Sequence, residues 1–132
     1  TKENLIRMLE QAPETIFLGH GPGFWRYISA DAETSAEGYP STPMKEKGLL
    51  WELFEKFENL YGDLSAGSGF NALTRQPDGG QEFLRSFSDR ILFARDYFDD
   101  RLQVHLDTLS LSDDVRDAVM SVNALRLVPL GD

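Results

Sequence analysis

The chain has 132 residues, 41% of them hydrophobic and 11% aromatic, which is enough apolar material for one packed domain over residues 1–132 and argues against disorder. Its formal net charge of −9 argues against nucleic acid or an anionic membrane as a partner, because such polyanions are bound by clustered Lys and Arg. No cysteine is present, so disulfides, iron–sulfur clusters and thiol catalysis are excluded, and any metal ion must be bound by His and carboxylates. The absence of cysteine fits a cytoplasmic protein. Apolar runs are only a few residues long, too short to span a bilayer, and predict a soluble chain.

The start of the chain predicts a helix and then a buried strand. Apolar residues recur at helical spacing over residues 4–12, and Pro13 ends that helix. Residues 15–18 (Thr-Ile-Phe-Leu) show no polar alternation, which is typical of a parallel strand buried on both faces. The strand stops at residues 19–23, where Gly and Pro are too frequent for either kind of element.

The middle of the chain repeats this order of elements. A short helix or turn over residues 24–28 leads into a long connection, residues 29–47, of the kind that is usually functional or mobile. Residues 49–57 have a strong helical pattern that Asn59 can end as a C-cap, and residues 60–64 read as a second strand.

The remaining sequence continues the alternation to the end of the chain. It predicts a Gly-rich loop, a turn, a helix, a third strand and two helices, in this order: residues 65–69, 76–80, 81–87, 91–94, 101–109 and 113–127. Helices alternating with short apolar strands indicate βα units, whose strands are parallel. The predicted fold class is therefore α/β, with three parallel strands and flanking helices.

Polar residues follow all three strands: His20, then Asp63 and Ser65, then Asp96. Sites in parallel α/β folds lie at the carboxyl ends of the strands, so we expect these side chains to lie near one another. His20 suits a metal ligand or a general acid/base, and the alternative is an imidazole bonded to a nearby carbonyl group. Asp96 suits a metal ligand or a proton acceptor, and the alternative is a pair with a neighbouring arginine or a helix N-cap.

For two other groups, a structural role is the stronger interpretation than a functional one. His105 lies between apolar residues of a predicted helix and is expected to pack or to face solvent. The aromatic residues Phe24, Trp25 and Tyr27 could wall a pocket, but aromatic residues after a strand more often cap a core.

Four segments in this order resemble the C-terminal part of the amidohydrolase-related family of metal-dependent hydrolases: residues 16–25, 59–65, 89–96 and 123–127. The resemblance implies a TIM-type barrel in which the three predicted strands are the sixth, seventh and eighth. It also implies a divalent metal, with zinc as the expected ion, and a small-molecule substrate with an amide, ester or related carbonyl group that is hydrolysed or decarboxylated.

By the same resemblance, His20 is the sixth-strand histidine and Asp96 the eighth-strand aspartate, and both are assigned as metal-binding and catalytic residues. The sequence before the aspartate departs from the family, with Ala94 and Arg95 where Gly and Ser or Thr are common. The family's first-strand His-x-His pair and fifth-strand histidine have no counterpart. A barrel of this type needs about 250 residues, so one copy of the chain is expected to lack part of the ligand set.

Two functions follow as hypotheses. The chain is a fragment or truncated form of a hydrolase, inactive unless the missing barrel half supplies the other ligands, or it is a non-catalytic domain that works through self-association or partner binding. Three parallel strands leave two unpaired edges that invite pairing. We therefore expect a homo-oligomer or a complex with the missing half.

Overall fold

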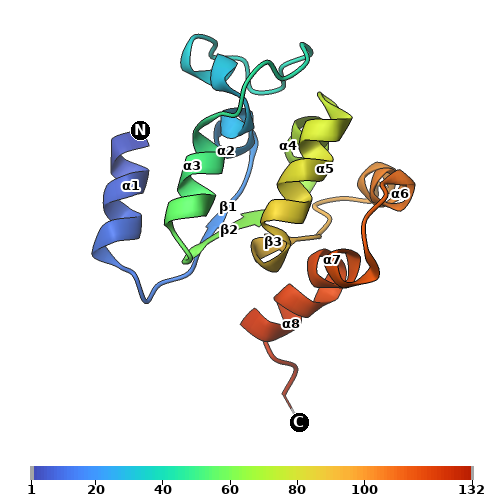
Figure 1. Ribbon diagram of the computed structural model, residues 1–132. Helices are drawn as coiled ribbons and strands as arrows, with labels where there is room; N and C mark the ends of the chain where they lie inside the picture. The colour runs from blue at the N-terminus through green and yellow to red at the C-terminus, as the bar shows by residue number, and fades with distance from the viewer. Residues whose placement is uncertain (1, 132) are drawn as a thin grey trace.

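Three short strands form one parallel sheet in the computed structural model, which describes residues 2–131 (Figure 1). The strands are β1 (Phe17–Gly19), β2 (Leu60–Asp63) and β3 (Ile91–Leu92), in the spatial order β1-β2-β3. Phe17 is in register with Leu60, and Gly62 with Ile91. Because neighbouring strands run in the same direction, their carboxyl ends meet at one edge, as the sequence predicted.

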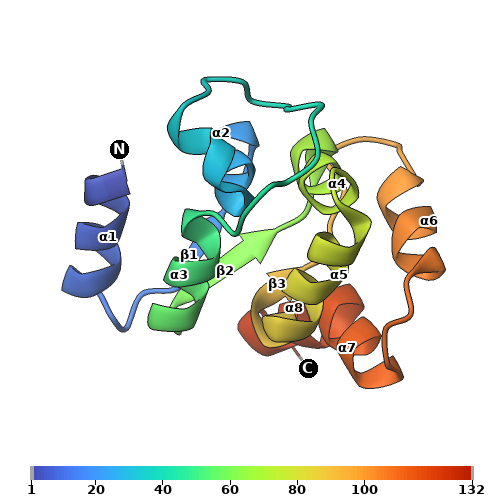
Figure 2. The same cartoon turned by 45° about the horizontal axis from the view of Figure 1, so that its top comes forward.

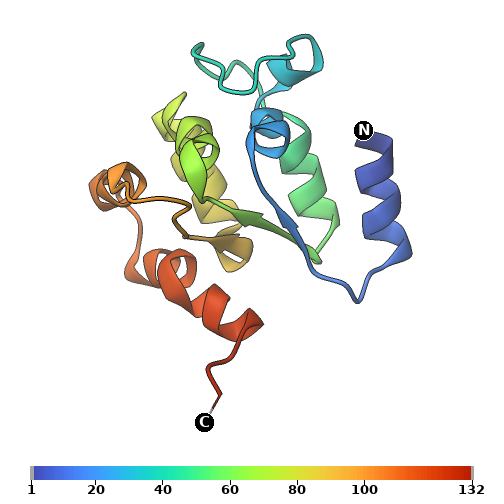
Figure 3. The ribbon, with the colours of Figure 1, turned by 180° about the vertical axis from the view of Figure 1, so that it is seen from behind.

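Helices connect the strands and continue beyond them. The helical segments are α1 (Lys2–Gln11), α2 (Pro22–Trp25), η1 (Arg26–Ile28), η2 (Ala30–Glu33), α3 (Leu49–Lys56), α4 (Ala66–Thr74), α5 (Pro77–Ser86), η3 (Ser88–Arg90), α6 (Arg101–Thr108), α7 (Asp113–Asp117), η4 (Ala118–Val122) and α8 (Asn123–Leu127). Helix α1 lies beside α3 at one end of the molecule, and α6 to α8 gather at the other (Figures 1 and 3). No helix among residues 2–131 is long and apolar enough to cross a membrane.

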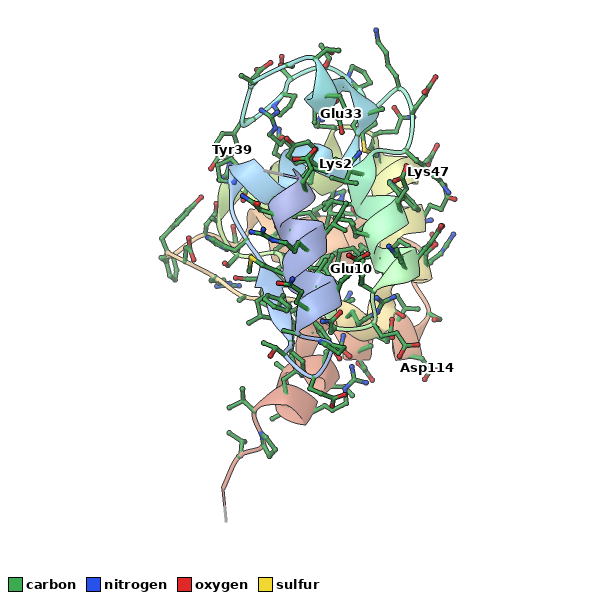
Figure 4. All side chains as sticks on the ribbon, turned by 90° about the vertical axis from the view of Figure 1, so that its left-hand side faces the viewer. Lys2, Glu10, Glu33, Tyr39, Lys47 and Asp114 are labelled. Atoms are coloured by element: carbon green, nitrogen blue, oxygen red, sulfur yellow. The ribbon has the colours of Figure 1, made fainter. Side chains whose placement is uncertain are left out.

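Helix α1 is tied to the rest of the molecule by charged and polar contacts near both of its ends. Lys2 Nζ lies 3.7 Å from Glu33 Oε1, and Glu10 Oε1 accepts a bond from Lys56 Nζ at 2.9 Å (Figure 4). The amide of Asn59 donates to the carbonyl groups of Leu9, Ala12 and Thr15, which lie at and just after the end of α1. Asn59 was predicted as the C-cap of α3, but that helix is capped at Phe57.

The sheet is buried on one face and partly open on the other. Leu60 and Ile91 are fully buried in a core that includes Phe54 and Phe83 of the covering helices. On β1 the opposite face is uncovered: Leu18 is 57% exposed, and Ile16, just before the strand, is 47% exposed. The prediction of a first strand buried on both faces was therefore wrong.

Residues 65–69, predicted as a Gly-rich loop, instead begin helix α4. The sequence signal was misleading because Gly69 serves close packing rather than a turn: a Cβ there would lie 2.6 Å from the carbonyl oxygen of Leu64. The same error affects residues 76–80, which form the first turn of α5 with Pro77 at its start. Gly80 lets α5 approach α4, since a Cβ would lie 2.2 Å from Leu73 O.

The outer edge of β3 is capped by the C-terminal helices. Leu92 O bonds to Leu64 N on the β2 side, so the neighbouring Phe93 N–H points to the outer edge, where it donates to Val119 O at 2.9 Å. The buried amide of Asn123 donates to Ser88 O at 2.6 Å and to Ile91 O at 2.8 Å. The helix predicted over residues 113–127 thus contains a π-helical turn, η4, whose Val119 carbonyl bonds to the strand. β3 ends two residues earlier than predicted.

The connection over residues 29–47 is fastened to helix α4 (Figure 2). Arg75 Nε donates to Thr42 O at 2.8 Å, and Asn71 Nδ2 donates to Pro40 O at 3.1 Å. Arg75 also pairs with Asp31. Burial raises the pKa of Asp31, but the hydrogen bond from the Arg75 guanidinium outweighs it and holds that pKa below its ordinary value. These contacts hold the connection against the C-terminal end of α4.

Candidate active site

The carboxyl ends of the strands bring one histidine and two aspartates together. Gly19 is in register with Gly62, so His20 emerges level with Asp63, and Asp96 comes from the loop that follows β3. His20 Nδ1 lies 3.1 Å from Asp63 Oδ2, and His20 Nε2 lies 3.9 Å from Asp96 Oδ2. The imidazole therefore stands between two carboxylates, and the expectation that His20 and Asp96 lie near each other agrees with this geometry.

Ser65 completes the cluster around the imidazole. Its hydroxyl donates to Asp63 Oδ2 at 2.8 Å, and its backbone N–H donates to Asp63 Oδ1 at 2.8 Å. Ser65 Oγ also lies 3.2 Å from His20 Nδ1. Asp63 and Ser65 were noted only as polar residues after the second strand and were not assigned to the site. Their position level with His20 was the signal that could have placed them there.

Aromatic side chains pack against the strand ends that carry this cluster. The indole of Trp25, only 1% exposed, donates to the backbone carbonyl of Asp63 at 2.7 Å. It approaches the sheet closely enough that a Cβ on Gly62 would lie 2.9 Å from the ring. The ring of Phe24 lies over Gly19 in the same way. Of the two alternatives for these aromatic residues, the structure supports the core cap for Trp25.

Asp96 is open to solvent and is not neutralised by the arginine that precedes it. Its side chain is 46% exposed. The guanidinium of Arg95 turns away to Gln103 Oε1 and stands over the ring of Phe93, 5.8 Å from its centroid. A different pair forms nearby, in which the Arg101 side chain hydrogen-bonds to Asp99 and lowers the pKa of that carboxyl. Asp96 is thus left facing His20.

The cluster offers a divalent metal only part of a ligand set. A zinc ion binds His nitrogen at about 2.0–2.1 Å and carboxylate oxygen at about 2.0–2.2 Å, so the 3.9 Å between His20 Nε2 and Asp96 Oδ2 lies within the reach of one ion. The Asp96 side chain is nearly half exposed and can rotate towards tetrahedral geometry. Among residues 2–131, however, no group of three or more His, Cys, Asp or Glu could hold a metal. The residues fit as two ligands of a larger set.

A cleft of about 430 Å³ opens beside the cluster, within the range of small-molecule sites. It is lined by Tyr39 of the long connection, Phe70 of α4, and Tyr97 and Arg101 from the segment after β3. Two of its lining residues, Ala66 and Tyr97, directly follow the cluster residues Ser65 and Asp96 in the sequence. The cleft contains aromatic walls and hydroxyl groups close to the strand ends.

His105 lies outside the cluster, as expected. Its ring contacts Phe70 edge-on at 6.1 Å between centroids, and its Nε2 is buried with no hydrogen-bond partner among the described residues. Burial lowers the pKa of His105 below its ordinary value of 6.5. The residue packs between helices rather than serving as a ligand.

Comparison with known proteins identifies the family. The amidohydrolase family model matches residues 4–130, which is nearly the whole chain, so the chain belongs to the amidohydrolase family. This agrees with a partial barrel and indicates a hydrolase-type function, and members of the family usually bind a divalent metal. No curated protein and no solved structure matches the chain.

Proposed function

We propose that this chain is one domain of a metal-dependent hydrolase and contributes His20 and Asp96 to its site. The substrate would be a small molecule with an amide, ester or related carbonyl group, and decarboxylation is the alternative reaction. The observation that carries the proposal is the pair of atoms His20 Nε2 and Asp96 Oδ2, 3.9 Å apart at the carboxyl ends of parallel strands.

The charge around His20 suits a cation. Asp63 and Asp96 place two carboxylates beside one imidazole, and no arginine or lysine of the described residues pairs with either of them. When bound, a divalent metal such as zinc polarises a carbonyl group and lowers the pKa of a bound water. A catalytic zinc usually has three protein ligands. His20 and Asp96 would supply two of them, and residues outside residues 1–132 the rest.

Each side chain has a role that its surroundings allow. Asp96 Oδ2 is exposed and unpaired with arginine, so it can hold the cation or accept a proton from an attacking water. The His20 ring is held on its Nδ1 side, which leaves Nε2 to bind the cation or to stabilise charge that develops on the substrate. The adjoining cleft would bind the rest of the substrate.

Calorimetric titration of the purified chain with zinc tests this proposal. We expect binding that His20→Ala and Asp96→Ala each weaken by roughly tenfold or more, because loss of a residue that only orients a ligand already weakens metal binding by about 10–100-fold. Asp99→Ala is the matched control, because Asp99 lies three residues from Asp96 but pairs with Arg101. Absence of zinc binding, or equal binding by wild type and Asp96→Ala, would contradict the proposal.

One observation favours a second candidate, a non-catalytic domain that associates with another copy or a partner. The outer edge of β3 is capped by Val119 and Asn123, whereas no strand of residues 2–131 pairs with the outer edge of β1. The exposed Leu18 beside that open edge would drive association. Light scattering after size exclusion tests this: Leu18→Lys should give monomers, and Met8→Lys on exposed α1 should not. A monomeric wild type would contradict it.

A further inference from the structure

The hydrogen bonds around His20 determine which ring nitrogen carries the proton. A serine hydroxyl has one proton, and that of Ser65 is donated to Asp63 Oδ2 at 2.8 Å. Towards the imidazole, Ser65 Oγ therefore offers only lone pairs. The carboxylate of Asp63 also only accepts. Both oxygens near His20 Nδ1, at 3.1 and 3.2 Å, are thus acceptors.

The opposite assignment leaves an unfavourable contact. If the neutral ring carried its proton on Nε2, the lone pair of Nδ1 would face the carboxylate of Asp63 at 3.1 Å with no proton between them. Two acceptors that face each other with no proton between them repel, which costs free energy. The Nδ1–H form avoids this cost, because its proton can be shared between Asp63 and Ser65.

Asp63 is itself held rigidly. Its Oδ1 accepts the backbone N–H of Ser65 at 2.8 Å, and its carbonyl accepts the indole N–H of Trp25 at 2.7 Å. Trp25 is anchored in the core, so the orientation of the carboxylate follows from the fold rather than from solvent. A rigid acceptor fixes both the plane and the protonation of the ring it binds.

We propose that Asp63 is a positioning residue that holds His20 in the Nδ1–H form and so places the lone pair on Nε2, the nitrogen that faces Asp96. The tautomer follows from the hydrogen bonds alone; its use in metal binding rests on the proposed function. Nε2 is then the ring atom that can bind a cation or accept a proton from the substrate. Ser65 assists because its hydroxyl group donates its hydrogen bond to Asp63 and not to the ring.

Nitrogen-15 NMR of the histidine-labelled chain tests the assignment. In spectra recorded at alkaline pH, long-range proton–nitrogen couplings identify which nitrogen of a neutral imidazole carries the proton. His105 provides a second imidazole in the same sample as an internal reference. We expect His20 to be protonated on Nδ1. Protonation on Nε2 in the wild-type chain would overturn the inference without the need for any variant.

Variants assign the effect to Asp63. Asp63→Asn introduces an amide that can donate to Nδ1, and we expect it to shift His20 towards the Nε2–H form. Ser65→Ala should keep the Nδ1–H form, because Asp63 still accepts. Asp99→Asn is the control, because Asp99 pairs with Arg101 and not with His20. If Ser65→Ala alone reverses the tautomer, or a folded Asp63→Asn leaves it unchanged, Asp63 is not the positioning residue.

Addition of zinc to the labelled wild-type chain separates this inference from the proposed function. Zinc that shifts Nε2 while Nδ1 keeps its proton supports both. No response to zinc, with the Nδ1–H form established, contradicts the proposed function and leaves the assignment of Asp63 supported. Zinc bound through Nδ1 would overturn the assignment.

Discussion

The guanidinium of Arg75 lies 2.5 Å from the carboxylate of Asp31, and the arginine side chain is only 2% exposed. This pair joins helix α4 to the connection that borders the strand ends. Substitution of Arg75 leaves Asp31 without its cationic partner in a partly buried place.

We expect Arg75→Met to lower the free energy of unfolding by about 2–4 kcal/mol, because it removes one member of a largely buried pair. Urea denaturation measures the change. Lys56→Met is the control: its pair with Glu10 is exposed, and such pairs contribute about 0–1 kcal/mol. Equal effects of the two substitutions would contradict the fastening role of Arg75.

Two glycines of α4 are expected to respond to alanine in opposite directions. Gly69→Ala places a Cβ 2.6 Å from backbone atoms of Leu64 that cannot move away cheaply, so it should destabilise by about 1–3 kcal/mol. Gly67→Ala meets only ordinary contacts at 3.6 Å with Tyr39 and Tyr97, and the gain in helix propensity, at most about 1 kcal/mol, should stabilise. Thermal unfolding compares the pair. A stabilising Gly69→Ala would show that α4 does not pack closely on the end of β2.

Asn123 should contribute strongly to stability because one amide satisfies two carbonyl groups. Asn123→Leu leaves Ser88 O and Ile91 O without their donor, and we expect a loss of about 2–4 kcal/mol. Asn71→Leu, which removes a single bond to Pro40, is the control and should lose about 1 kcal/mol. Hydrogen exchange gives a local measure: the amide of Phe93, bonded to Val119, should exchange faster in Asn123→Leu. Unchanged protection would contradict the capped edge.

The pH dependence of stability should contain a contribution from His105. Burial lowers its pKa in the folded state below 6.5, so the unfolded chain binds the proton more readily. The stability that the neutral ring contributes is complete above pH about 6.5 and is lost as the pH falls below that value. Urea midpoints at several pH values should fall more steeply on acidification for wild type than for His105→Leu. Since His20 is present in both proteins, the difference isolates His105, and parallel curves would contradict the prediction.

The sequence predicted the order of elements and the parallel sheet because periodicity and apolar runs are local signals. It placed His20 and Asp96 at strand ends for the same reason. It did not predict α4 or the first turn of α5, because Gly69 and Gly80 have the composition of a turn and are explained only by the backbone that packs against them. Such a contact between segments has no signature in either segment alone.

The supporting residues of the site were missed for a related reason. Asp63 and Ser65 gain significance only from the register that places them beside His20. Likewise, Asn59 looked like a helix cap, whereas its three hydrogen bonds cross 44 to 50 residues of sequence. A single sequence indicates which residues are capable of chemistry, whereas the fold determines which of them come into contact.

A sheet with one capped edge differs in its assembly from a sheet with two open edges. Copies that offered both edges could add head to tail without limit and grow into fibres. Here Val119 and Asn123 occupy one edge, so any strand pairing between copies must join β1 to β1 about a two-fold axis and stop at two. The C-terminal helices would thus limit strand pairing to a dimer.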